Sequence, residues 1–122
     1  MKAILVVDDE FALVEMLESE LVDGSYRVRT ATNGRQGLER LRETKPDLVL
    51  VDYMMPNLDG PGMIDAMRKQ AEHHDTPVII MSAVGESIVR ERVPVYAAFL
   101  QKPFRISNAL ATIKTVFGQN SG

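Results

Sequence analysis

The sequence predicts an α/β fold in which five parallel strands alternate with helices. Runs of branched apolar residues at 3–7, 48–51 and 77–81 are too short for helices and lack the alternation of half-exposed strands. Between the runs, apolar residues recur at the three- and four-residue spacing of amphipathic helices. Strands that alternate with helices in this way form right-handed crossovers and a doubly wound parallel sheet.

The elements of the first half follow in order. A helix comes after the first strand, and the turn residues at 23–24 end it. Residues 26–31 alternate in polarity, which is typical of a more exposed strand. The turn at 33–34 opens a second helix, which ends before Pro46. The apolar residues of the two helices are Phe11, Val14, Leu17, Leu21, Leu38 and Leu41.

The second half repeats the pattern. A break at 56–60 precedes the third helix, and Pro94 ends a short fourth one. Residues 97–100 form the last strand, and the final helix covers 106–117. We expect residues 1–117 to form one domain and residues 118–122 to form a flexible tail. The third helix is marked by Met63, Ile64 and Met67.

The apolar character of the strands predicts their order. Strands 3–7, 48–51 and 77–81 are the most apolar and should be central, whereas 26–31 and 97–100 should be edges. This gives the flavodoxin-like order 2-1-3-4-5. In such a sheet, ligands bind at the carboxyl ends of strands one and three, where the winding reverses.

Composition narrows the classes of function. The 122-residue chain has no cysteine, which excludes zinc–cysteine sites, iron–sulfur clusters and thiol nucleophiles and is typical of a reducing cytosol. A formal charge of −3 offers no basic footprint for nucleic acid. No apolar run has the length of a bilayer or the form of an export signal. We therefore expect a cytoplasmic single domain that binds neither membrane nor nucleic acid directly.

Charged and polar residues collect at one end of the predicted sheet. Asp8 and Asp9 follow the first strand and Asp52 ends the third, while Ser82 and Lys102 follow the fourth and fifth. Three crowded carboxylates repel each other, and a hard divalent cation such as Mg²⁺ relieves that repulsion. A lysine and a hydroxyl can then contact phosphoryl oxygens, and one carboxylate can act as the nucleophile. The set predicts phosphoryl chemistry.

As an ordered set these motifs resemble a known family. From about Lys2 to Phe117 the chain is similar to the CheY-like response-regulator receiver domain of two-component signalling. The residues that carry the resemblance are Asp8-Asp9, Asp52, Met55-Pro56, Asp59-Gly60, Ser82-Ala83 and Lys102-Pro103-Phe104.

The resemblance implies a role for each matched position. Asp52 would be the phospho-acceptor. Asp9 would bind Mg²⁺ directly, Asp8 would do so directly or through water, and the backbone carbonyl of Met54 would complete the protein ligands together with Asp52. Family members take the phosphoryl group from a phosphohistidine of a histidine kinase or phosphotransfer protein, and often from small acyl phosphates.

The resemblance also implies a switch. Lys102 would pair with the phosphoryl group, Ser82 would supply the switching hydroxyl, and Phe99 would be the aromatic rotamer switch. Met54 and Val84 would flank the path of the hydrolytic water. Phosphorylation would remodel the face of the fourth helix, fifth strand and fifth helix, where a downstream protein binds. Residues 84–98 are shorter than usual for the family, which affects this output face.

Each residue also has a plainer interpretation. The acids at 8–10 could cap a helix, Lys102 could be a solvated charge, Ser82 could satisfy loop backbone groups, and Phe99 could serve packing. We interpret residues 73–74, a pair of histidines, as part of a surface loop.

We expect a standalone single-domain response regulator, and the alternative is a fragment of a larger response regulator or hybrid histidine kinase. Two other classes of protein conflict with the residues present. A phosphatase of haloacid-dehalogenase type needs an acid two residues after its nucleophile, where Met54 stands. A flavin carrier needs a phosphate-binding loop where the acids at 8–10 would repel phosphate. We expect a signalling domain and not an enzyme acting on another substrate.

Overall fold

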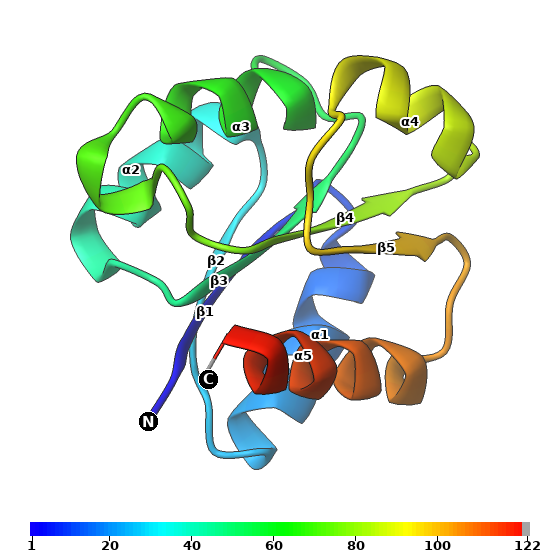
Figure 1. The fold of residues 1–122 in the computed structure, drawn as a ribbon. Coiled ribbons are helices and arrows are strands. Elements are labelled where there is room, and N and C mark those ends of the chain that lie inside the picture. Colours follow the sequence, from blue (N-terminus) through cyan, green and yellow to red (C-terminus); the bar gives the residue numbers. More distant parts are fainter. Residues whose placement is uncertain (121–122) are drawn as a thin grey trace.

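Five parallel strands form one sheet in the order β2-β1-β3-β4-β5 in the computed structural model, which describes residues 1–120 (Figure 1). The predicted fold class and strand order are confirmed. The strands are β1 (Ala3–Val7), β2 (Arg27–Ala31), β3 (Leu48–Asp52), β4 (Val78–Ser82) and β5 (Ala98–Gln101).

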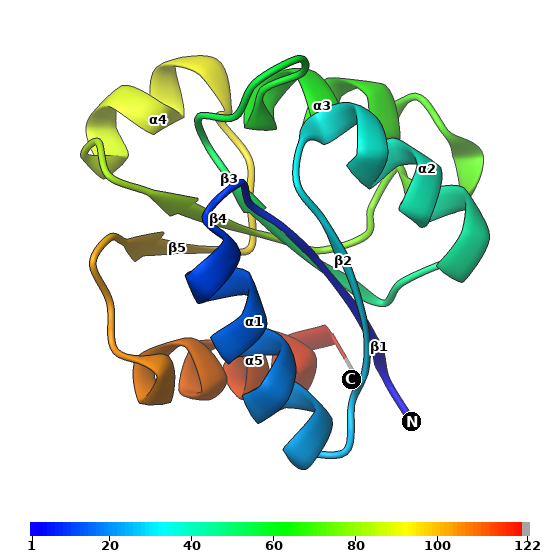
Figure 2. The same cartoon turned by 180° about the vertical axis from the view of Figure 1, so that it is seen from behind.

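Helices cover both faces of the sheet. Figure 1 shows α2, α3 and α4 above it and α1 and α5 below it, and Figure 2 shows the same layers from behind. The helices are α1 (Phe11–Asp23), α2 (Gly34–Thr44), α3 (Gly60–Arg68), α4 (Glu86–Arg92) and α5 (Ile106–Asn120), with a short 3₁₀ turn η1 (Ala71–His73) before β4.

The central strands are buried on both faces because side chains alternate along a strand. In β1, Leu5 and Val7 pack with the α2, α3 and α4 side, whereas Ile4 and Val6 pack with α1 and α5. All residues of β1, β3 and β4 are buried, and β2 alternates between exposed and covered positions. This is the pattern on which the predicted order depended.

Element ends differ slightly from the expectations. β3 and β4 extend to Asp52 and Ser82, so both functional candidates stand on the last residue of a strand. α4 has only seven residues and ends at Arg92, as the position of Pro94 predicts. α5 continues to Asn120, into the segment expected to be a tail; residues 121–122 lie outside the described residues.

The interpretation of both histidines as surface residues is wrong for His73. Its side chain is 3% exposed, and its Nδ1 lies 2.9 Å from Thr76 Oγ1. Arg68 donates hydrogen bonds to the carbonyl oxygens of His73 and Thr76 and so folds the connector back onto α3. His74 is exposed, as expected. The polar sequence of this connector does not predict the burial of His73, because Arg68, which holds the connector in place, belongs to α3.

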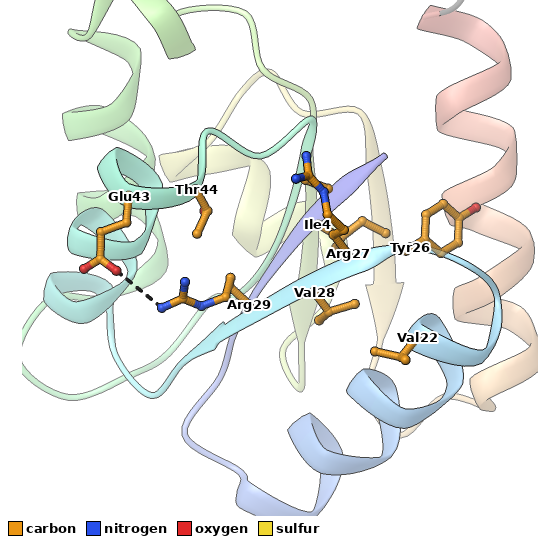
Figure 3. A pocket seen from close by; sticks show the side chains of 9 residues that line it. Ile4, Val22, Tyr26, Arg27, Val28, Arg29, Glu43 and Thr44 are labelled. Atoms are coloured by element: carbon orange, nitrogen blue, oxygen red, sulfur yellow. Dashed lines mark hydrogen bonds and ion pairs between the residues drawn. The ribbon is translucent and has the colours of Figure 1, made fainter. Parts of the chain in front are cut away.

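A groove of about 490 Å³ lies beside β2, at the amino ends of β1 and β2 (Figure 3). An ion pair of 3.3 Å between Arg29 and Glu43 crosses part of it. The groove is remote from the carboxyl ends of the strands and contains none of the predicted site residues. Within residues 1–120, no helix is both long and apolar enough to cross a membrane.

Candidate functional site

Three carboxylates meet at the carboxyl ends of β1 and β3. Asp8, Asp9 and Asp52 each present one oxygen, and these oxygens lie within 4.8 Å of one another. Asp8 and Asp52 are buried, while Asp9 is exposed. The neighbouring parallel strands β1 and β3 end side by side, and this brings residues more than forty positions apart into one cluster.

Backbone contacts fix two of these residues. The Asp8 N–H donates to Ala31 O at 3.1 Å, and Asp8 Oδ1 accepts the Glu10 N–H at 2.9 Å. Behind Asp52, α3 approaches so closely that a Cβ on Gly60 would lie 2.4 Å from the Asp52 carbonyl oxygen. Asp59 and Gly60 therefore have structural roles. Asp59 caps α3 by accepting the Gly62 N–H, and Gly60 leaves room for the end of β3.

Helix capping does not account for the acids at 8–10. The N-cap residue of α1 is Glu10, whose side chain makes no capping hydrogen bond. Asp8 bonds the N–H of Glu10, one residue before the first helical position.

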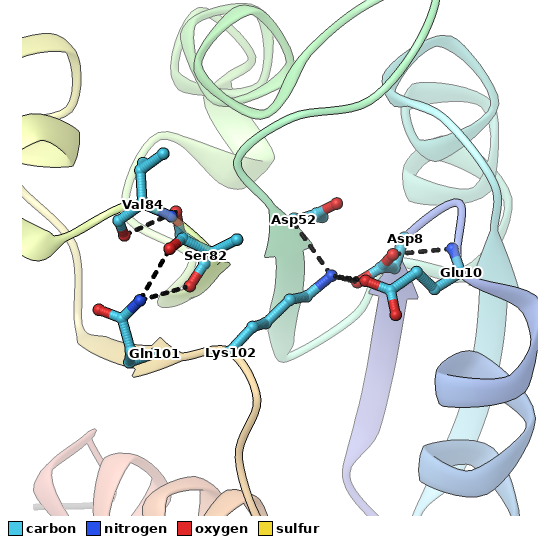
Figure 4. Close-up of polar contacts among 8 residues, drawn as sticks. Asp8, Glu10, Asp52, Ser82, Val84, Gln101 and Lys102 are labelled. Atoms are coloured by element: carbon cyan, nitrogen blue, oxygen red, sulfur yellow. Dashed lines mark hydrogen bonds and ion pairs between the residues drawn. The ribbon is translucent and has the colours of Figure 1, made fainter.

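Lys102 reaches into the cluster from the end of β5 (Figure 4). Its Nζ lies 2.7 Å from Asp8 Oδ2 and 3.4 Å from Asp52 Oδ1. It also donates a hydrogen bond of 2.6 Å to Glu10 Oε1. The lysine side chain is 11% exposed, so it is not a solvated surface charge. The Lys102–Pro103 peptide bond is cis.

Burial and like charge shift the protonation equilibria of the site. Burial, reinforced by the negative charge of Asp8, raises the pKa of Asp52 to about 6. Burial also raises the pKa of Asp8, against the opposing influence of Lys102. For Lys102, burial favours the neutral amine, but its contacts with Asp8 and Glu10 outweigh that effect and raise its pKa. The site therefore holds more negative charge than one lysine neutralises.

The donor set fits a hard divalent cation. The only atoms offered by the triad are carboxylate oxygens, which suit Mg²⁺ better than softer metals. Asp8 and Asp52 are buried, and the Lys102 ammonium is the cation that contacts both of them in the described structure. The raised pKa of both carboxyls shows that one ammonium does not offset their burial and mutual repulsion, and a divalent cation at this position would relieve both.

Ser82 and its loop stand on the other side of Lys102. Ser82 Oγ donates to Val84 O and accepts the Val84 N–H, both at 3.0 Å, so the hydroxyl serves its own loop. The Lys102 N–H donates to Ser82 O at 2.7 Å, and the Gln101 amide donates to Ala83 O at 3.0 Å (Figure 4). The plainer interpretation of Ser82 thus describes this conformation, in which the β4–α4 loop is tied to the end of β5.

The remaining predicted residues lie around the site. Met54 is 64% exposed and has no ionisable group, so it cannot supply the proton that a phosphatase of haloacid-dehalogenase type requires. Val84 is half-buried beside Ser82. Phe99 is half-buried and packs against the core beneath α2, α3 and α4, as expected of a strand residue.

Two polar contacts of the site were not predicted. The sequence pattern predicts only a capping role for Glu10, although its place beside Asp9 at the same end of the sheet also suits a partner of Lys102. The hydrogen bonds from Gln101 to the β4–α4 loop could not be predicted from the sequence, because a glutamine at an exposed strand position has many possible partners.

The fold and the site together define a class: doubly wound α/β proteins with an acidic cluster and a lysine at the switch point of the sheet. The response regulator receiver domain family matches residues 4–114. The chain belongs to this family.

Relatives and solved structures agree with that assignment. The chain is 39% identical to the "Probable transcriptional regulator ycf27" of Porphyra purpurea over 93% of its own length and 46% of the relative. It is 33% identical to the response regulator ArlR of Staphylococcus aureus, covering 95% of this chain and 52% of ArlR. The chain thus spans about half the length of the curated relatives it matches.

Among structures, the chemotaxis response regulator CheY4 of Vibrio cholerae aligns with a TM-score of 0.88 at 27% identity, over 95% of this chain and 98% of that one. The response regulator TrrA of Thermotoga maritima, solved in complex with Mg²⁺-BeF, aligns with a TM-score of 0.83 at 29% identity, over 95% and 99% of the two chains.

Proposed function

We propose that this receiver domain accepts a phosphoryl group on Asp52 in the presence of Mg²⁺ and thereby changes its surface for a partner protein. One observation carries the proposal: the Asp52 carboxylate lies both in an oxygen cluster suited to a divalent cation and within 3.4 Å of the buried Lys102 ammonium. That pairing is what an acceptor of a multiply charged group requires.

The proposed transfer forms one bond and breaks one. A carboxylate oxygen of Asp52 attacks the phosphorus, and the bond from phosphorus to the donor's imidazole nitrogen breaks. The electron pair of that bond stays on the leaving nitrogen, and a proton on the other ring nitrogen makes the released histidine neutral. Asp8, Asp9, Asp52 and the backbone carbonyl of Met54 would hold Mg²⁺, which neutralises charge on the phosphoryl oxygens. Lys102 would bind one of those oxygens.

The proposed signal passes through Ser82 and Phe99. To reach a phosphoryl oxygen, the Ser82 hydroxyl would leave Val84, and the β4–α4 loop would move with it. Phe99 packs against the same core cluster as Val84 of that loop, and its ring would follow the movement. The proposed partner surface is made of α4, β5 and α5. Ile88 of α4 is 50% exposed, and Val95, in the loop between α4 and β5, is 76% exposed, which supports a protein contact.

The partners are proposed by chemical class. Response regulators act between histidine kinases and downstream effectors, so a phosphohistidine protein of the cytoplasm is the proposed donor. The curated relatives are about twice as long as this chain. The proposed phospho-acceptor function belongs to the domain, whether it acts alone, as the sequence led us to expect, or as part of a longer regulator or hybrid kinase.

Incubation with acetyl phosphate and Mg²⁺, followed by intact mass measurement, tests the proposal. We expect one phosphoryl group on the wild type, none on Asp52→Asn, and normal labelling of the control Asp65→Asn, an exposed acid of α3. Asp9→Ala should need much more Mg²⁺ for the same labelling. Labelling of Asp52→Asn at wild-type level would refute the assignment of the acceptor.

A further inference from the structure

Glu10 holds the ammonium group of Lys102 at the rim of the acidic cluster. The hydrogen bond from Lys102 Nζ to Glu10 Oε1 is 2.6 Å long, whereas the same nitrogen lies 3.4 Å from Asp52 Oδ1. The Glu10 side chain is 59% exposed, yet its carboxylate points toward Lys102 (Figure 4). The lysine is thus paired more closely with a carboxylate outside the triad than with the proposed acceptor.

The side chain of Glu10 has no other task in the described part of the chain. Glu10 is the N-cap residue of α1, but its carboxylate makes no capping bond. The bonds that anchor the residue belong to its backbone: its N–H donates to Asp8 Oδ1, and its carbonyl oxygen accepts the Val14 N–H. A substitution at position 10 therefore removes the contact with Lys102 and leaves the start of α1 in place.

We infer that Glu10 is a positioning residue that holds Lys102 in the unphosphorylated state and thereby opposes phosphoryl binding at Asp52. The inference rests on the proposed function and concerns the same site. A phosphoryl group on Asp52 needs the Lys102 ammonium as its counter-charge, so the ammonium must leave Glu10 when that group arrives. The free energy of the Glu10–Lys102 contact then stabilises the empty state alone.

Asp8 also contacts Lys102, at 2.7 Å, but it cannot serve the same test. Asp8 belongs to the proposed metal ligands, so replacing it changes cation binding and lysine position together. Glu10 lies outside the triad, and its exposed carboxylate can be changed alone. A substitution of Glu10 can therefore change the position of Lys102 without removing a proposed metal ligand.

Two variants separate contact from charge. Glu10→Asp keeps the charge but shortens the side chain, and Glu10→Gln keeps the length but removes the charge. We expect both to bind beryllium fluoride, a mimic of the phosphoryl group, about two- to fivefold more tightly than the wild type at saturating Mg²⁺, the range for a partly exposed ion pair. The control Glu15→Gln removes an exposed charge one turn further along α1 and should bind like the wild type.

A second measurement needs neither Mg²⁺ nor the mimic. The ¹⁵Nζ and ¹³Cε resonances of Lys102 in the apo protein should shift in both Glu10 variants and stay unchanged in Glu15→Gln. Unchanged Lys102 resonances would show that the contact is absent and would overturn the inference.

The binding data divide the remaining outcomes. If the wild type binds beryllium fluoride and both Glu10 variants bind it equally or more weakly, the inference is overturned. The proposed function is not affected by that result. Tighter binding by Glu10→Gln alone assigns the effect to overall charge and also overturns it. A wild type that does not bind the mimic with Mg²⁺ refutes the proposed function, and the role of Glu10 falls with it.

Discussion

Arg92 Nη1 donates a 3.0 Å hydrogen bond to Asp59 Oδ2, which joins the last residue of α4 to the N-cap of α3. The other oxygen of Asp59 accepts the Gly62 N–H, so one carboxylate serves both helices. Asp59 closes the loop that begins after Asp52. The pair thus connects the short helix α4 with the loop of the proposed phospho-acceptor, over 33 positions of sequence.

Breaking this pair should loosen α4 from the acceptor loop. In Arg92→Gln, we expect the amide NMR signals of Asp59 and Gly62 to shift, because Asp59 loses its partner, while the rest of α3 keeps its signals. The control Arg90→Gln removes a cation from the same helix that pairs with Glu86 instead. Equal shifts at Asp59 in both variants would show that the Arg92 contact is not specific.

Asp52 should make stability depend on pH. Its folded-state pKa of about 6 lies above the unfolded value of 3.8, so proton uptake favours the folded protein. Stability without Mg²⁺ should therefore fall as pH rises from about 4 to about 6. Asp52→Asn removes the buried charge and should raise the free energy of unfolding at pH 7 by about 1–3 kcal/mol, with little gain below pH 4.

Urea unfolding across this pH range, with Asp65→Asn as the control, measures the effect. Asp65 is exposed on α3, so its replacement should not change the pH profile. A gain in Asp52→Asn that is equal at pH 4 and pH 7 would contradict a titrating carboxyl as its cause.

His73 should destabilise the fold at acidic pH. Burial lowers the pKa of His73 below its ordinary value of 6.5, against the influence of Glu72, while Arg68 and Lys45 act in the same direction as burial. The neutral imidazole is the folded form, so stability falls as pH drops below about 6.5. The loss of melting temperature between pH 7 and pH 5 should be smaller in His73→Gln than in His74→Gln, which alters the exposed neighbour. Equal pH profiles would exclude His73 as the titrating group.

Gly60 should not tolerate a side chain. An alanine Cβ would lie 2.4 Å from the Asp52 carbonyl oxygen and 3.0 Å from Tyr53 Cα, both backbone atoms that cannot give way alone. We expect Gly60→Ala to lower the free energy of unfolding by about 1–3 kcal/mol and to shift the Asp52 amide resonance. Gly85→Ala is the matched control, because nothing lies within 4 Å of its added Cβ. Comparable stability of the two variants would contradict this account.

The proposed aspartyl phosphate should be long-lived. Met54 and Val84 flank the expected path of the hydrolytic water, and neither side chain can orient a water molecule by hydrogen bonding. Changing Met54→Asn and Val84→Glu together should accelerate phosphate release from the purified phosphoprotein. Equal or slower release in the double variant would show that another feature controls access of water.

The sequence alone determined the elements and the place of the site. Apolar runs of five residues, helical spacing between them and acids at their ends are local patterns, and parallel crossovers bring the ends of β1 and β3 together. Asp8, Asp9 and Asp52 could therefore be placed in one cluster before any coordinates were known. The apolar character of the runs also predicted the strand order, because a central strand is covered on both faces, and the burial of β1 and β3 confirms it.

Only the tertiary structure determined which partner each polar side chain binds. Lys102 bonds Glu10, a residue 92 positions away, and Arg92 bonds Asp59. His73 is buried because Arg68 folds its connector onto α3. Such pairings depend on distances of a few ångströms between packed elements, and no local periodicity encodes them. Long side chains at the rim of a site can reach several partners, and the packing around them selects one.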